Sequence, residues 1–241
     1  MGCQFGNARI NHVMYADDLI LTSPSFCGMQ KIVDICGAYA LSQDILFNPS
    51  KSCLLKMNSN QNNSCILKLN GGEIPVINNC KYLGYEISTD MKDDTRILAL
   101  CRYVYATGNG IIKNFGKCSN NVKLQLFKTY IYNMYGLSLS ANYKGSSMNK
   151  LRVAYNSIFR KLMKLPLYRD GVNHSVRGFF VNHKVQSFAE RQRKIYFSLM
   201  DRLKRSDNLL IKNIVHFSDT PFHSDIWKQW KTALYLLPKD C

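Results

Sequence analysis

The sequence predicts an α+β fold, in which a small region of short strands and one helix precedes a basic, mainly α-helical region. Two observations predict it. Before Asp94 the apolar residues occur mostly in short β-type runs between polar turns, whereas after it they recur at steps of three and four residues. Residues 1–95 carry seven basic and nine acidic side chains, but residues 96–241 carry 25 basic and seven acidic ones. We therefore expect two domains, residues 1–90 and residues 91–241.

The first domain begins with a predicted β-hairpin. Residues 9–14 and residues 19–22 are rich in β-favouring side chains, and the tetrapeptide Tyr-Ala-Asp-Asp of residues 15–18 separates them. We therefore expect Asp17 and Asp18 to lie at the turn of this hairpin.

An amphipathic helix is expected next, from Met29 to Tyr39, with Ser25 placed to cap it. Three short β-type runs follow, each bounded by polar residues: residues 52–57, 65–69 and 82–87. The polar segment Asn58–Ser64 predicts a hairpin loop, and Asn70-Gly71-Gly72 predicts a turn.

The second domain is expected to contain four main helices, at residues 97–105, 122–134, 151–165 and 185–203. Gly108 and Gly110 should end or kink the first of these helices. Asn120 or Asn121 should cap the second, and Pro166 should stop the third. A last short helix is expected to hold the two tryptophans, Trp227 and Trp230.

The composition excludes several classes of protein. An apolar content of 46% with 20% charged residues indicates a globular chain and excludes a disordered one. No apolar run approaches the roughly 20 residues that cross a bilayer, and the first ten residues do not resemble a secretory signal, so we expect the cytoplasm or the nucleus. The nine cysteines form no Cys-x-x-Cys pair and are expected to be small buried groups, not zinc ligands.

The net charge of +16 is concentrated in the second domain. Binding of a polyanion is one natural use of this charge, because each neutralised phosphate releases counterions. The alternative is that the basic side chains only keep the helices soluble. The charge alone leaves both interpretations open.

Adjacent carboxylates at a turn between apolar strands repel each other, and a divalent cation would relieve that repulsion. Mg²⁺ prefers oxygen ligands and often binds one or two carboxylates together with substrate phosphates. A turn that needed only polar residues would more often be Asn-Gly or Asp-Gly. Asp17 and Asp18 are therefore candidate metal ligands. The second acidic pair, Asp93-Asp94, precedes a helix, where carboxylates are favoured by the helix dipole, and we interpret it as structural.

Residues 14–19, Met-Tyr-Ala-Asp-Asp-Leu, resemble the Tyr-Ala-Asp-Asp motif of reverse transcriptases, especially those of non-LTR (LINE-like) retrotransposons. Two further blocks follow in the order of that family. Residues 47–52, Phe-Asn-Pro-Ser-Lys-Ser, resemble its Asn-x-x-Lys-Ser/Thr block, and residues 79–87 resemble its Tyr-Leu-Gly block near the primer grip. The resemblance covers nearly the whole chain. It implies that the first domain is part of a polymerase palm and the second is the thumb with a C-terminal helical extension.

The resemblance implies a role for each matching residue of the first domain. Asp17 would be the principal ligand of Mg²⁺ or Mn²⁺ in two-metal nucleotidyl transfer, and Asp18 would be its partner. Tyr15 would lie beside the primer terminus. Lys51 would donate a proton to the pyrophosphate leaving group or contact a phosphate. From the residues alone, packing is an alternative explanation for Tyr15, and a solvated side chain is an alternative explanation for Lys51.

The resemblance also implies the remaining contacts and partners. Three residues are expected to support the primer: Tyr82, Leu83 and Gly84. Nucleic-acid contacts in the second domain are expected from four basic residues: Arg152, Arg160, Lys161 and Lys164. The implied partners are an RNA template, a DNA primer and deoxynucleoside triphosphates, with no membrane partner.

Reverse transcriptases hold both metals with a third carboxylate on an earlier palm strand, and that strand and the fingers precede the Tyr-Ala-Asp-Asp motif. Here only Met1 to Met14 precede it, and no other acid has a suitable context. We therefore expect Mg²⁺ or Mn²⁺ binding by this chain alone to be weak or absent, and we expect no DNA polymerisation by it. Three hypotheses remain. The chain is an inactive part of a retrotransposon reverse transcriptase, a non-catalytic basic helical nucleic-acid-binding protein, or an enzyme completed by a partner chain that supplies the missing acid.

Overall fold

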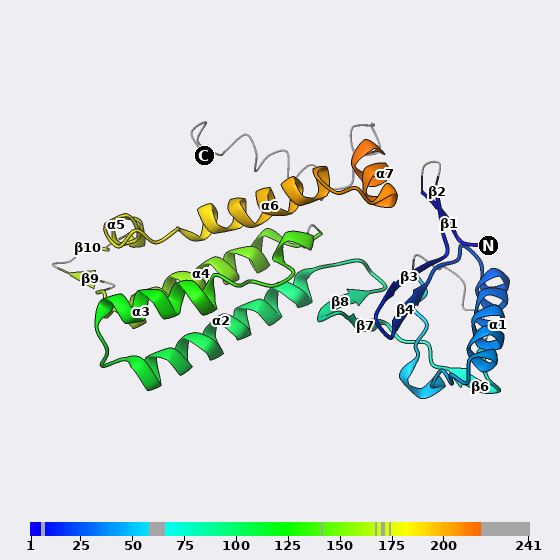
Figure 1. Ribbon diagram of the computed structural model, residues 1–241. Helices are drawn as coiled ribbons and strands as arrows, with labels where there is room; N and C mark the ends of the chain where they lie inside the picture. The colour runs from blue at the N-terminus through cyan, green and yellow to red at the C-terminus, as the bar shows by residue number, and fades with distance from the viewer. Residues whose placement is uncertain are drawn as a thin grey trace. The chain divides into compact units, whose positions relative to one another are not determined.

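The computed structural model describes most of the chain: residues 1–5, 8–57, 66–140, 142–166, 168–169, 172–173 and 175–217 (Figure 1). It contains both α-helices and short antiparallel strands, so the predicted mixed α and β class is confirmed. The chain forms two compact units, and the boundary falls between Met91 and Lys92. The helix α7 (Leu209–Phe217) groups with the first unit.

The first unit contains β-hairpins and the long helix α1 (Phe26–Ser42). Its strands pair in sequence order: β1 (Cys3–Phe5) with β2 (Ala8–Ile10), β3 (His12–Tyr15) with β4 (Asp18–Leu21), β5 (Leu67–Leu69) with β6 (Gly72–Ile74), and β7 (Asn79–Tyr82) with β8 (Tyr85–Ser88). Each described sheet has two strands. The described strands therefore form separate hairpins, not one continuous sheet.

The predicted amphipathic helix is confirmed as α1. The Ser25 hydroxyl caps it by accepting a hydrogen bond from the backbone N–H of Gly28 at 3.1 Å. Val33 on its buried face packs against the apolar residues of the β5–β6 hairpin: Leu67, Leu69 and Ile74. Leu21 of β4 packs against the same small core, which anchors the β3–β4 hairpin through one strand.

Two of the predicted strands differ in the structure. Residues 82–87 are not one strand, because Leu83 and Gly84 form the turn that joins β7 to β8. Gly84 is a turn-forming residue, but leucine at position 83 does not favour a reversal. In the predicted strand at residues 52–57, an isolated bridge joins Leu54 to Val76. The predicted turn at Asn70 is confirmed, whereas the loop predicted at Asn58–Ser64 lies outside the described residues.

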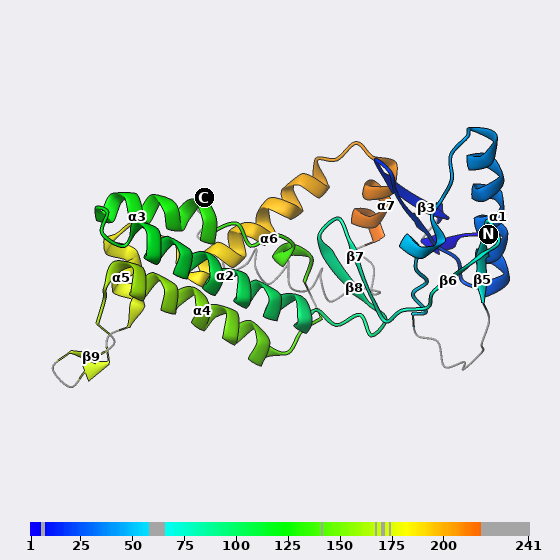
Figure 2. The same cartoon turned by 90° about the horizontal axis from the view of Figure 1, so that it is seen from below.

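The second unit is a helical assembly (Figure 2). It has a large apolar core. Its described elements are α2 (Asp94–Phe115), α3 (Asn120–Leu126), the π-helical turn η2 (Phe127–Ile131), the 3₁₀ turn η3 (Leu137–Leu139), α4 (Gly145–Met163), the short strands β9 (Tyr168–Arg169) and β10 (Val172–Asn173), α5 (Val176–Asn182) and α6 (Phe188–Lys204). Helices α2 and α4 lie side by side along most of their length. Between them and η2 lie fully buried side chains: Val104, Phe127, Leu151, Tyr155, Ile158 and Phe159.

The glycines of α2 do not end the helix, because α2 continues through both to Phe115. Gly108 is buried against α4, and a Cβ at this position would lie 2.3 Å from Cγ2 of Ile158. The missing side chain lets the two helices approach closely. Helix packing therefore outweighs the low helix propensity of glycine.

The other helix ends follow local capping rules. The N-cap of α3 is Ser119, whose hydroxyl accepts from Val122, so the prediction of Asn120 or Asn121 as the cap is wrong. Helix α4 ends at Met163, before Pro166, as predicted. Helix α6 begins with a capping box between Ser187 and Glu190. Helices α5 and α7 were not predicted, and the helix expected at Trp227 and Trp230 lies outside the described residues.

Buried polar contacts tie α6 to the rest of the second unit. The Tyr155 hydroxyl donates to the carbonyl of Gln186 at 2.7 Å, and the backbone N–H of Gln186 donates to the Tyr132 hydroxyl at 2.7 Å. The guanidinium of Arg191 lies over the Tyr132 ring at 5.0 Å. In the part of the chain that is described, no helix combines the length and apolar character needed to cross a membrane.

Candidate metal-binding hairpin and nucleic-acid interface

Asp17 and Asp18 lie at the tip of the β3–β4 hairpin. Tyr15 pairs with Asp18 across the ladder, so that Ala16 and Asp17 form a two-residue turn. Both carboxylates are exposed to solvent, and all of β3 is exposed as well. The structure therefore presents Tyr15, Asp17 and Asp18 together on one accessible hairpin, as the sequence predicted.

The turn of this hairpin is strained. Ala16 has a φ of 52°, a left-handed conformation that costs an L-residue about 1–2 kcal/mol. The β5–β6 turn makes a useful comparison, because it places Asn70 and Gly71, residues that adopt such angles easily, at φ values of 50° and 79°. Strained backbone is commonly retained where function requires a particular side chain or shape. The Ala-Asp turn is therefore a candidate functional feature.

The two carboxylates fit a weakly held divalent cation. Mg²⁺ is often bound through one or two carboxylates, and water and phosphate oxygens complete its octahedral shell. Asp17 and Asp18 supply that number of ligands at an exposed tip. Within the described ranges, no group of three or more histidine, cysteine, aspartate or glutamate side chains is placed to hold a metal. Water or substrate must therefore provide most of the ligands at this hairpin.

Lys51 lies on a different element of the first unit, the 3₁₀ turn η1 (Pro49–Lys51). The side-chain oxygen of Asn48 caps this turn by accepting from the backbone N–H of Ser50 at 3.0 Å. Lys51 itself is exposed, and none of the ion pairs among described residues joins it to Asp17 or Asp18. The lysine and the two acids thus share a unit without forming an ion pair.

The predicted primer-supporting residues Tyr82, Leu83 and Gly84 lie on the β7–β8 hairpin. Leu83 and Gly84 form its turn with φ values of 47° and 78°. Leucine is unusual at such a position, so this is a second strained turn. Among the described hairpin turns, Ala16 and Leu83 are the two residues that have a positive φ although their residue types disfavour it. They lie in the first and third blocks that resemble the reverse transcriptase family.

Two of the basic residues predicted to contact nucleic acid, Arg152 and Arg160, line one cleft beside α4. Arg152 donates from Nε and Nη2 to the side-chain oxygen of Asn149 at 3.0 and 2.6 Å. Arg160 donates from Nη1 to the carbonyl of Pro166 at 2.7 Å. Each guanidinium carries five N–H donors.

Lys161 and Lys164, the other two predicted contacts, lie at the end of the same helix but do not line the cleft. Lys161 is exposed in the last turn of α4. Lys164 follows the helix with a φ of 54° and is also exposed. Of the four basic residues predicted to contact nucleic acid, the structure therefore places only the two arginines in the lining of this cleft.

The acidic pair Asp93-Asp94 has a structural role. The Asp94 carboxylate accepts from the backbone N–H of Lys144 at 3.0 Å and from the hydroxyl of Ser147, so it caps the start of α4 from the neighbouring helix. Asp93 accepts from the backbone N–H of Asn142 at 2.8 Å. The Ser147 hydrogen bond, with that of Lys144, holds the pKa of Asp94 below its ordinary value.

The cysteines are mostly not buried, contrary to the prediction. Among the described cysteines Cys101 is buried, whereas Cys27 and Cys118 are exposed and the others are half-buried. The thiols of Cys53 and Cys80 share a hydrogen bond. Burial is the main cause that raises the pKa of Cys53 to about 11, and the hydrogen bond with Cys80 is the second cause. The reactive thiolate of Cys53 is therefore scarce at neutral pH.

Comparison of the chain with known protein families, with curated protein sequences and with solved structures found no match.

Proposed function

We propose that the chain is part of an RNA-directed DNA polymerase of the reverse transcriptase type, that the β3–β4 hairpin carries its metal ligands, and that the chain binds nucleic acid. The observation that supports this most is the strained Ala16 turn, which exposes the consecutive residues Asp17 and Asp18 to solvent. A turn without a function would more easily use Asn-Gly, as the β5–β6 hairpin does. The order of the three sequence blocks adds support.

Each residue of the first unit has a task in this proposal. Asp17 and Asp18 hold a divalent cation, which in two-metal polymerases activates the primer hydroxyl and steadies the triphosphate. Tyr15, exposed on β3, contacts the primer terminus, and exposed Lys51 contacts a phosphate. Within the described residues no third acid joins Asp17 and Asp18. We therefore expect metal and nucleic-acid binding by the 241-residue chain without primer extension.

Metal binding at the hairpin is tested by titrating the full chain with Mn²⁺ and following the electron paramagnetic resonance signal of free Mn²⁺. The D17N/D18N variant should lose the binding seen in the wild type. The matched control is D34N/D44N, which removes two exposed carboxylates from the same unit and should retain it. Equal Mn²⁺ binding by all three proteins, or none by the wild type, would contradict the proposed metal site.

Catalysis is tested with poly(rA) primed by oligo(dT), together with thymidine triphosphate and Mg²⁺ or Mn²⁺. No extension is expected from the chain alone. Extension that disappears in the D17A variant would show that the two carboxylates suffice, and our expectation of inactivity would be wrong.

A second candidate function is non-catalytic nucleic-acid binding by the helical unit. The observation that favours it is the charge of residues 96–241, with 25 basic and seven acidic side chains. RNA binding that weakens steeply with salt, but is unaffected by Mn²⁺ and by D17N/D18N, would favour this function over the polymerase.

A further inference from the structure

We propose that the cleft between α4, α5 and α6 binds the phosphate groups of a single nucleic-acid strand. The inference rests on the proposed binding of nucleic acid and adds the place where the backbone is held. The cleft has a volume of about 450 Å³ and lies within the second unit. Three arginines line it: Arg152, Arg160 and Arg177.

The arginines converge from two helices. Arg152, Asn156 and Arg160 follow one another at intervals of four residues, so they share one face of α4. Arg177 comes from α5. Each guanidinium presents a planar set of N–H donors that matches two phosphate oxygens at once. Arginines from two helices around one opening can therefore hold neighbouring phosphates of one strand.

The lining of the cleft contains no Asp or Glu among the described residues. The acid nearest in the chain, Glu190, accepts a hydrogen bond from the backbone N–H of Ser187 at 2.6 Å as part of the α6 capping box. That bond is the largest cause of the lowered pKa of Glu190, and the positive charge of Arg177 is a smaller cause. Among the described residues, the Arg177 guanidinium makes no hydrogen bond or ion pair, so its N–H donors can bind an anion.

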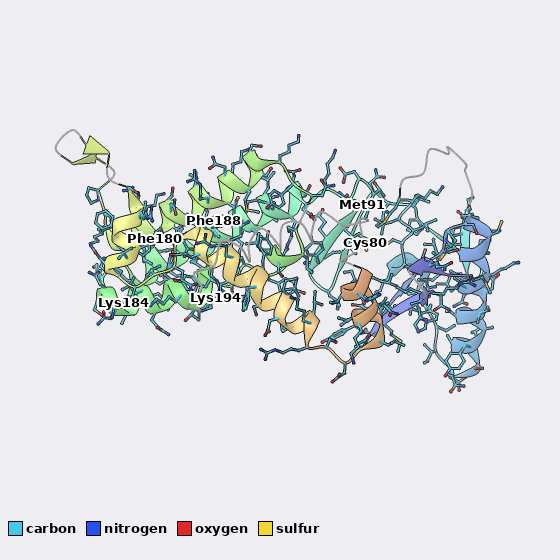
Figure 3. All side chains as sticks on the ribbon, turned by 90° about the horizontal axis from the view of Figure 1, so that it is seen from above. Cys80, Met91, Phe180, Lys184, Phe188 and Lys194 are labelled. Atoms are coloured by element: carbon cyan, nitrogen blue, oxygen red, sulfur yellow. The ribbon has the colours of Figure 1, made fainter. Side chains whose placement is uncertain are left out.

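The floor of the cleft is apolar and firmly packed. Phe180 of α5 and Phe188 of α6, both labelled in Figure 3, are buried beneath it. Each ring lies 5.8 Å from the ring of Tyr155 on α4. This cluster holds the three helices together, so the arginines surround a preformed opening.

A nucleic-acid strand suits the cleft because exposed positive charge continues beyond it. Arg152 and Arg177 are exposed at the cleft, and Lys161 and Lys164 lie further along the α4 segment. A polyanion can use the cleft and these neighbours together, whereas an isolated phosphate can use the cleft alone. Strand binding also needs no base-specific donor, because phosphate contacts position a strand without reading its sequence.

The test measures binding of the full chain to a short fluorescein-labelled oligouridylate, by fluorescence anisotropy over a range of KCl concentrations. The R152Q/R177Q variant removes two cleft charges. The control R102Q/K113Q removes the same charge from exposed positions of α2, in the same unit and outside the cleft. The R152K/R177K variant keeps the charge but loses the guanidinium fork. Circular dichroism and thermal melting confirm that each variant is folded.

We expect R152Q/R177Q to weaken binding about tenfold or more. The slope of log K against log salt should become shallower by about 0.7 for each phosphate that the variant no longer neutralises. The affinity of the control R102Q/K113Q should stay within about twofold of the wild type, because exposed charges outside the site are screened. The affinity of R152K/R177K should lie between those of the control and R152Q/R177Q. Binding by R152Q/R177Q equal to that of the control would overturn the cleft proposal and leave nucleic-acid binding intact. A wild-type chain that fails to bind oligouridylate would overturn both.

Discussion

Two glycines of α2 are expected to respond in opposite directions to the same substitution. A Cβ on Gly108 would lie 2.3 Å from Cγ2 and 2.7 Å from Cδ1 of Ile158, whereas a Cβ on Gly110 would meet nothing within 4 Å. Overpacking of a buried contact costs about 1–3 kcal/mol, and Gly→Ala in a helix contributes about 1 kcal/mol of stability. Gly108→Ala should therefore lower the free energy of unfolding by up to about 2 kcal/mol, and Gly110→Ala should raise it by about 0.5–1 kcal/mol.

The measurement is thermal and urea unfolding of the full chain, followed by the helical signal in circular dichroism. For a unit of this size, about 1 kcal/mol changes the melting temperature by about 4 °C. The variants should thus melt on opposite sides of the wild type. Gly108→Ala in an Ile158→Ala background removes the clashing atoms, so there the alanine should stabilise the protein and reveal coupling between the two positions. A Gly108→Ala variant as stable as Gly110→Ala would refute the close packing of α2 on α4.

Two further predictions concern the turns and the acidic cap. Leu83→Asn should relieve about 1 kcal/mol of strain at φ 47°, and the reciprocal Asn70→Leu at φ 50° should cost about as much. Hydrogen exchange of the backbone amides measures the stability of both hairpins. A β7–β8 hairpin that is destabilised by Leu83→Asn would contradict the proposed strain at Leu83. The lowered pKa of Asp94 means that its carboxylate stabilises the folded state above about pH 4, and that this contribution is lost as the pH falls through the folded pKa. The stability difference between wild type and Asp94→Asn should therefore be larger at pH 7 than at pH 3, and an equal difference in urea unfolding at both would argue against the cap.

Local patterns in the sequence predicted much of the first unit. The helix α1 followed from its apolar spacing and from Ser25, and the β3–β4 hairpin followed from two β-type runs around the acids. Such signals succeed because the capping bond and the turn involve residues only a few positions apart. The β7–β8 turn escaped prediction because Leu83 adopts an angle that its residue type disfavours.

The second unit shows where local reasoning stops. Gly108 has the signature of a helix breaker in the sequence, yet it lies inside a helix because Ile158, fifty residues later, fills the space of its side chain. The role of Asp94 in capping α4 likewise depends on two helices meeting. Neither relation is evident from a window of neighbouring residues, because the partners become close only when the helices pack.

The sequence by itself determined the α and β character of the chain, the exposed acidic hairpin and the concentration of positive charge in its second part. Periodicity, turn chemistry and charge are local or additive properties, so they are present before folding. Only the tertiary structure decided that Arg152 and Arg160 share a cleft with Arg177, and that Lys161 and Lys164 lie outside it. The physical reason is that the buried contacts of Tyr155 with Phe180 and Phe188 bring α5 and α6 against α4, and no sequence pattern specifies where those faces meet.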